Sequence, residues 1–156
     1  MAAVSLDDLS EATGMKRPSL YGAFGNKEFM YLGALSDFSK LFQEPAARLM
    51  QSSDCRQGLE EFFASALGLY GDRGCLLVCT AATEARSSRA VKRALTEVLE
   101  QLDGLMVRFF AKFTPDGEAR GRLAASLLHS VAVRCRAGLP EQDLRRLISG
   151  ALDILC

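Results

Sequence analysis

Cationic and hydroxyl side chains gather near the start of the chain, in the stretch KRPSLYGAFGNKE of residues 16–28. The first residues of this stretch include Lys16, Arg17 and Ser19, and Tyr21 follows them. Such side chains hydrogen-bond the phosphate oxygens and base edges of DNA. The whole chain balances 19 Lys and Arg against 19 Asp and Glu, so it does not have the basic surface of a general polyanion-binding protein. Any contact with nucleic acid is therefore expected to be local.

Thiols are the second group with reactive potential. The chain has an odd number of cysteines, mostly in apolar runs: Cys55, Cys75, Cys79, Cys135 and Cys156. This pattern predicts reduced thiols in a reducing compartment. Cys75 and Cys79 share one face of a helix and could sense oxidants or electrophiles, or bind a soft metal. One pair does not complete a metal site, and apolar surroundings raise a thiol pKa, so inert buried thiols are favoured, with no metal and no cofactor.

Catalysis would need paired carboxylates, a nucleophile with a base, or a metal cluster in one pocket. His129 is the only histidine, and no phosphate-binding or dinucleotide-binding glycine loop occurs. Acidic residues such as Glu60, Glu61, Glu97 and Glu100 fall at positions expected to be solvated. The sequence therefore predicts that the chain is not an enzyme, and that His129 is a satisfied interface residue.

Capping signals and helical spacing of apolar residues predict an all-α fold. Three short N-terminal helices are expected: residues 6–13 with Ser5 as N-cap, a second opened by Pro18, and a third from Lys27 to about Glu44, where Pro45 interrupts or kinks it. Further helices are expected over residues 59–70, 75–85 and 91–113, followed by two antiparallel terminal helices. No apolar run reaches the roughly 18 residues of a membrane span and no leader opens the chain, so a cytoplasmic protein without membrane contact is expected.

The first two helices and the turn between them match the helix-turn-helix pattern. In that motif the second helix enters the major groove with its N-terminal residues toward the bases. Four apolar residues are expected to hold the two helices together: Leu9, Ala12, Leu20 and Phe24. The N-terminus of the next helix forms a second phosphate site. The candidate DNA-binding residues are Ser5, Lys16, Arg17, Ser19, Tyr21, Gly22 and Lys27. The alternative is a helical hairpin that caps a bundle.

The stretch SLDDLSEATGMKRPSLYGAFGNKEFMYLGAL resembles the DNA-binding signature of the TetR/AcrR family of bacterial repressors. The matching residues are Ser5, Leu9, Ala12, Gly14, Leu20, Tyr21, Phe24, Lys27 and Glu28. The later stretch GCLLVCTAATEA, with a long helix and two terminal helices, resembles the regulatory domain of one branch of that family. Family members normally carry a further helix before the position of Val4. Residues 1–28 are therefore expected to be a DNA-binding segment incomplete at its N-terminus, and the alternative is a version of the segment that binds DNA poorly.

The resemblance implies that residues 29–156 form a helical regulatory and dimerisation domain with a pocket for a small apolar or amphipathic effector. The candidate ligand-binding residues are Phe62, Phe63, Leu67, Tyr70, Thr83, Arg86, Leu102, Met106 and Phe109. For any one of the apolar residues, plain core packing is the alternative. The implied function is a ligand-responsive repressor that binds a palindromic operator in double-stranded DNA. The alternative function is a helical interaction or small-molecule-binding module without DNA binding.

The last two predicted helices carry apolar residues on more than one stripe. An exposed patch of this kind predicts a two-fold homodimer with a four-helix interface. The candidate interface residues are Leu128, Leu144, Leu147, Ile148, Ala151 and Leu152. The alternative is that both helices are covered by their own protomer.

Overall fold

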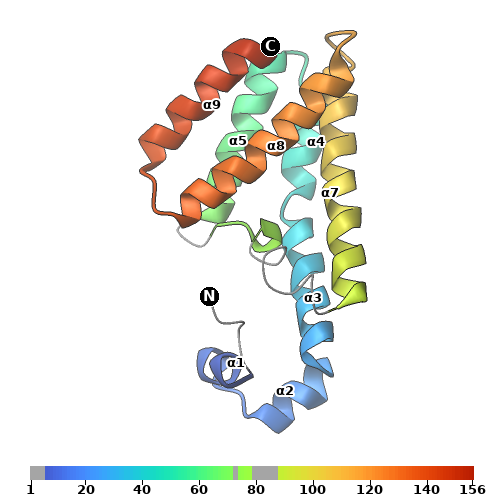
Figure 1. The fold of residues 1–156 in the computed structure, drawn as a ribbon, viewed down its shortest axis with the longest axis vertical. Coiled ribbons are helices and arrows are strands. Elements are labelled where there is room, and N and C mark those ends of the chain that lie inside the picture. Colours follow the sequence, from blue (N-terminus) through green and yellow to red (C-terminus); the bar gives the residue numbers. More distant parts are fainter. Residues whose placement is uncertain (1–5, 72–73, 79–87) are drawn as a thin grey trace.

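The computed structural model describes residues 6–71, 74–78 and 88–156, and every regular element in these ranges is an α-helix. The predicted all-α fold is confirmed. The helices are α1 (Leu6–Thr13), α2 (Arg17–Phe24), α3 (Lys27–Lys40), α4 (Gln43–Gln51), α5 (Cys55–Tyr70), α7 (Arg89–Phe110), α8 (Gly117–Arg136) and α9 (Glu141–Leu155). Figure 1 shows α1 and α2 below a bundle of the later helices, with α3 leading from α2 up into that bundle.

The short N-terminal helices begin and end where the sequence predicts. Pro18 lies in the first turn of α2, where its missing N–H costs nothing. Gly25 ends α2 with a positive φ of 77°, a conformation that favours glycine. The side chain of Asn26 then caps α3 by accepting a hydrogen bond from the backbone N–H of Phe29 at 3.0 Å.

The predicted C-terminal end of the third helix, at about Glu44, is wrong. α3 stops at Lys40, residues 41 and 42 form a turn, and α4 begins at Gln43. Pro45 therefore lies in the first turn of α4, and the break comes before it, at residues 41 and 42. In a continuous helix the Pro45 ring would clash with the carbonyl group of Leu41, four residues earlier, so the break falls there.

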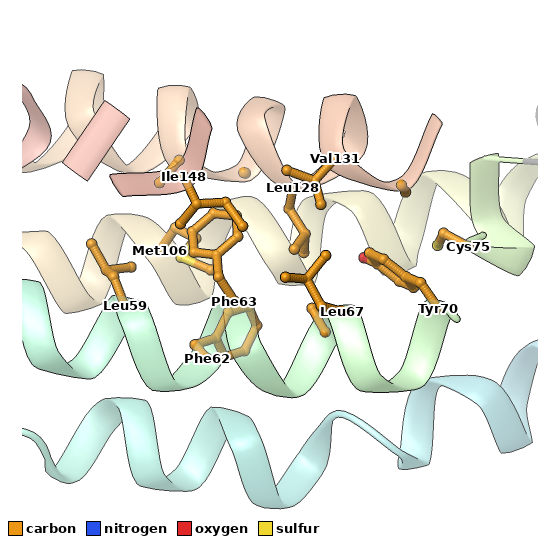
Figure 2. Packing of buried hydrophobic residues seen from close by; sticks show 14 of the residues in the cluster. Leu59, Phe62, Phe63, Leu67, Tyr70, Cys75, Met106, Leu128, Val131 and Ile148 are labelled. Carbon is orange, nitrogen blue, oxygen red and sulfur yellow. The ribbon is translucent and has the colours of Figure 1, made fainter. Parts of the chain in front are cut away.

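The core of the bundle forms around α5, which begins at Cys55, four residues before the predicted start. The Asp54 side chain caps this helix by accepting from the backbone N–H of Gln57 at 2.7 Å. In Figure 2, side chains of α5 point into the cluster of buried residues formed with the facing helices. α7 and α8 pack with their backbones in close approach, since a Cβ on Gly121 would lie 2.5 Å from the backbone nitrogen of Val107.

One disulfide bond, Cys55–Cys156, joins the start of α5 to the end of α9 over a sequence separation of 101 residues. The prediction of reduced thiols is wrong for this pair. Helix packing brings their Cα atoms to 5.8 Å, a relationship that the distance along the chain conceals. Cys75 and Cys135 are buried thiols, while Cys79 lies outside the described residues.

None of the described helices is both long and apolar enough to cross a membrane.

Candidate functional sites

The first candidate site is the outer surface of α2. Lys16, Arg17, Ser19 and Gly22 are exposed, and Tyr21 keeps 47% of its surface accessible. α2 lies at the end of the molecule opposite the bundle, where a large ligand can approach it (Figure 1). Each of these predicted DNA-binding residues is therefore accessible to a ligand. Ser5 and the side chain of Lys27 lie outside what the structure describes.

The predicted apolar contact between α1 and α2 forms only in part. Leu20 is 2% exposed, and Leu9 is half-buried. Phe24 remains 52% exposed and Ala12 is also exposed, so the prediction is wrong for these two. Each helix has eight residues, and a pair this short does not bury its whole apolar face.

Arg17, the strongest candidate for reading a base, pairs with an acidic residue of α1. Its Nε donates to Oδ1 of Asp7 at 2.6 Å, and both side chains are more than half exposed. Asp7 lies in the first turn of α1, where a carboxylate also interacts favourably with the helix dipole. The guanidinium group must therefore exchange this partner, or share it, to contact DNA.

The second candidate site is a cavity of about 340 Å³ between α3, α4, α5, α7 and α8. Aromatic and aliphatic side chains make up most of its wall, with a few polar groups among them. The lining residues are Phe38, Ser39, Phe42, Gln43, Ala46, Phe62, Tyr70, Cys75, Leu77, Val98, Gln101, Leu102, Leu105, Arg108, Leu128 and His129. Apolar walls with a few placed polar groups are typical of small-molecule sites.

Three of the predicted ligand-binding residues line this cavity: Phe62, Tyr70 and Leu102. Four others do not line it. Phe63, Met106 and Phe109 are fully buried in the core, and Leu67 packs in a shallow depression beside α9. Thr83 and Arg86 lie outside the described residues. Whether any of the three binds a ligand stays a prediction.

Helix geometry explains why two residues adjacent in sequence, Phe62 and Phe63, have different surroundings. Phe62 and Phe63 are about 100° apart around α5, so one ring faces the cavity and the other faces the core. The prediction missed the contribution of α3 and α4, through Phe38 and Phe42. It also missed Arg108, although Gln101, Leu105 and Arg108 have the spacing of one helix face.

Burial shapes the chemistry of two polar groups in the cavity wall. Desolvation raises the pKa of the Tyr70 phenol well above its ordinary value, and a hydrogen bond with Cys75 contributes. Desolvation also lowers the pKa of His129, against the opposing charge of Asp103. The Nε2 atom of His129 is buried and has no hydrogen-bond partner among the described residues. The expectation that His129 is a satisfied interface residue is therefore wrong at this atom.

No family model matches the chain. Two solved structures of the TetR family transcriptional regulator CifR, both cysteine mutants complexed with a 26-base-pair double-strand operator DNA, share its fold. They have TM-scores of 0.83 and 0.82 at 27% and 28% identity, and each comparison covers 96% of this chain and 85% of the other. A TetR transcriptional regulator from Legionella pneumophila has a TM-score of 0.76 at 19% identity, over 98% of this chain and 84% of the other. In both sequence and fold the chain is therefore similar to TetR-family transcriptional regulators.

A curated relative of this chain is the HTH-type transcriptional repressor ComR of Escherichia coli strain K12. The two are 26% identical over 127 residues, which cover 78% of this chain and 59% of ComR. The chain thus spans less than two thirds of that relative's length. The solved structures that resemble it are regulators and not enzymes, in agreement with the prediction that this chain is not an enzyme.

The chain buries most of the residues predicted for its dimer interface within its own protomer. These residues are Leu128, Leu144, Ile148 and Leu152, each at most 5% exposed. The prediction that these four residues lie at a dimer interface is therefore wrong. They lie on the inner faces of α8 and α9, and on α9 the inner face recurs every four residues. Leu147 is 36% exposed and Ala151 is half-buried, so these two remain candidates.

Proposed function

We propose that this chain is a ligand-responsive, TetR-family transcriptional repressor of the cytoplasm. As a homodimer it binds a palindromic operator in double-stranded DNA, and a small apolar or amphipathic effector releases it. The observation that carries this proposal is the exposure of Lys16, Arg17 and Tyr21 at one end of a fold shared with an operator-bound regulator. The relative ComR is named a transcriptional repressor, which supports repression rather than activation as the effect on transcription.

The proposed DNA contacts follow from position on the helices. Lys16, Arg17 and Ser19 stand at the N-terminus of α2 and would face base edges. Tyr21 would give its hydroxyl to a phosphate, and Gly22 has open space around it, so the DNA backbone can approach closely. Two further phosphate contacts, from Ser5 and from Lys27 at the N-terminus of α3, complete the proposed set.

The proposed division into residues 1–28 and 29–156 rests on burial. No residue before Tyr31 belongs to the main hydrophobic core or packs against it among the described residues. α3 crosses this boundary without a break and ends in the cavity wall, where Phe38 and Phe42 lie. The helix is therefore suited to connect an effector in the cavity with α2.

A route for release runs through the turn between α3 and α4. The Phe42 ring lies 6.2 Å from that of Phe62 and 6.1 Å from that of Tyr70, and all three line the cavity. An effector that displaces Phe42 would shift the end of α3, and with it α2, the helix proposed to read the bases. Such coupling is reciprocal: DNA must weaken effector binding by the factor that the effector weakens DNA binding.

The dimer is proposed to use the outer faces of α8 and α9. Leu147, Ala151 and Ile154 follow one helical stripe of α9, and Ile154 is 79% exposed. Leu123 of α8 is 61% exposed. Apolar side chains this exposed along two adjacent helices suit an isologous four-helix interface.

Titration with DNA from upstream of the chain's own gene tests the function. Sequence-specific binding that weakens steeply with salt is expected. The alternative function is an interaction module without DNA binding, and sequence-independent or absent binding by the full-length protein would favour it.

A further inference from the structure

The polar groups in the cavity wall indicate what kind of molecule the cavity accepts. We propose that the ligand is a small amphipathic carboxylic acid, bound as its anion, with the carboxylate on Arg108 and the apolar body among Phe42, Phe62 and Leu102. This inference deepens the proposed function by naming the chemical class of the effector. A volume of about 340 Å³ lies at the lower end of the range for small-molecule sites, so the acid must be small.

Arg108 is the only lysine or arginine among the described residues that line the cavity. No described carboxylate pairs with it. Other arginines of the adjoining helices do have acidic partners: Arg93 lies 3.2 Å from Glu97, and Arg122 lies 3.2 Å from Glu118. The Arg108 guanidinium group is thus left with its donors available, and planar donors of this kind match a carboxylate.

The absence of a side chain at Gly104 leaves room for the Arg108 guanidinium group. Gly104 stands one helical turn before Arg108, and a Cβ atom there would lie 3.1 Å from Nη1 of Arg108. The guanidinium group therefore lies against the backbone of α7, on the face that carries Gln101 and Leu105 into the cavity wall. Glycine weakens a helix interior relative to alanine, and here it leaves room for the cation.

The rest of the described wall favours an acid over a base. No aspartate or glutamate is among the described lining residues, so an amine would meet Arg108 without a compensating carboxylate. The hydroxyl of Ser39 already donates to the backbone oxygen of Leu35 at 2.9 Å. The Nε2 atom of His129 has no partner among the described residues, and it supplies a second polar contact for a hydroxyl or keto oxygen on the ligand body.

The test compares matched probes on the full-length protein by calorimetry and thermal shift. Octanoate and 4-phenylbutyrate are the acids, 1-octanol and 4-phenylbutan-1-ol the neutral analogues, and octylamine the cation. We expect each acid to bind about tenfold more tightly than its alcohol, the advantage of a charge-assisted hydrogen bond. Arg108→Gln should remove that advantage and leave the alcohols unchanged. Lys92→Gln, which removes an exposed cation of α7 outside the cavity, is the matched control and should change nothing.

Alcohols that bind as tightly as the acids would overturn the proposal, and so would unchanged acid binding in Arg108→Gln or no acid binding at all. An operator titration in the presence of octanoate separates the two levels of inference. Acid binding without operator binding would leave the ligand class standing and overturn the repressor. Operator binding that is released by a neutral compound, with no acid binding, would do the reverse.

Discussion

The Oγ atom of Ser88 donates a hydrogen bond to Oε2 of Glu28 at 2.5 Å, across 60 residues of sequence. Glu28 lies in the first turn of α3, close in sequence to the end of α2. Ser88 caps α7 by accepting from the backbone N–H of Val91 at 3.1 Å. This contact therefore joins the start of α3, which follows the proposed DNA-binding segment, to the start of α7, which forms one wall of the cavity.

Removing this link should loosen the DNA-binding segment without unfolding the bundle. Glu28→Ala deletes the contact but keeps the Ser88 cap, whereas Ser88→Ala deletes both and should cost about 0.5–2 kcal/mol more of unfolding free energy. A double-mutant cycle on urea unfolding should give a coupling energy of about 0.5–1.5 kcal/mol. Additive effects of the two substitutions would show that the hydrogen bond contributes nothing to stability.

The pair of Asp7 with Arg17 predicts a substitution that tightens operator binding. Asp7→Asn frees the guanidinium group and removes a negative charge beside the DNA phosphates, so the dissociation constant should fall. Arg17→Ala should weaken specific binding by about 1–3 kcal/mol. Fluorescence anisotropy with labelled operator measures both, and Asp37→Asn, an exposed carboxylate of α3 paired with Lys40, is the control. Weaker binding in Asp7→Asn would contradict the competition between Asp7 and DNA.

His129 predicts how stability responds to acid. Burial lowers its pKa in the folded state below the ordinary 6.5, while the Asp103 charge opposes the shift. Below pH 6.5 the unfolded chain then binds more protons at this position than the folded chain, so stability falls as pH falls from 6.5 through the lowered folded value. The unfolding free energy of wild type relative to that of His129→Gln should therefore fall as the pH is lowered from 8 to 5. Parallel pH profiles of the two proteins would contradict this.

The Cys55–Cys156 bond should stabilise the fold by restricting the unfolded chain. A closed loop of about 100 residues gives up to about 4.7 kcal/mol in the chain-entropy model, and measured values are typically about 2–4 kcal/mol. Cys156→Ser should lower the unfolding free energy by that amount and leave the helical circular dichroism intact, since Arg56 still binds Asp153 at 2.5 Å. Cys135→Ser, which alters a free thiol, is the control. Equal stability of wild type with and without a reductant would show that the bond does not form in solution.

The exposed apolar residues of α9 predict which substitutions should prevent dimer formation. Ile154→Glu or Leu147→Glu places a charge on the proposed interface and should yield a monomer in sedimentation, with tight operator binding lost. Gln142→Glu adds the same charge at an exposed position of α9 off that stripe and should remain a dimer. A wild-type chain that sediments as a monomer at micromolar concentration would overturn the dimer.

Local signals in the sequence determined the helices of the N-terminal segment. Pro18, Gly25 and Asn26 each act on their own backbone neighbours, through a fixed φ, a positive φ and a side-chain cap, so α2 and the start of α3 could be predicted from them. The all-α class followed from apolar spacing for the same reason. The end of α3 was missed because the effect of Pro45 falls on Leu41, four residues before it.

Only the tertiary structure decided which face of each helix meets which neighbour. The apolar stripe of α9 predicts burial, but it does not show whether the stripe packs against its own protomer or against a partner. In the structure, Leu144, Ile148 and Leu152 are buried within their own protomer. The cavity needed α3 and α4 to place Phe42 opposite Phe62, a relationship between distant segments. The pairing of Cys55 with Cys156 depended on the same packing. Contacts between residues far apart in sequence are set by how the helices pack together, and no short stretch of sequence contains that information.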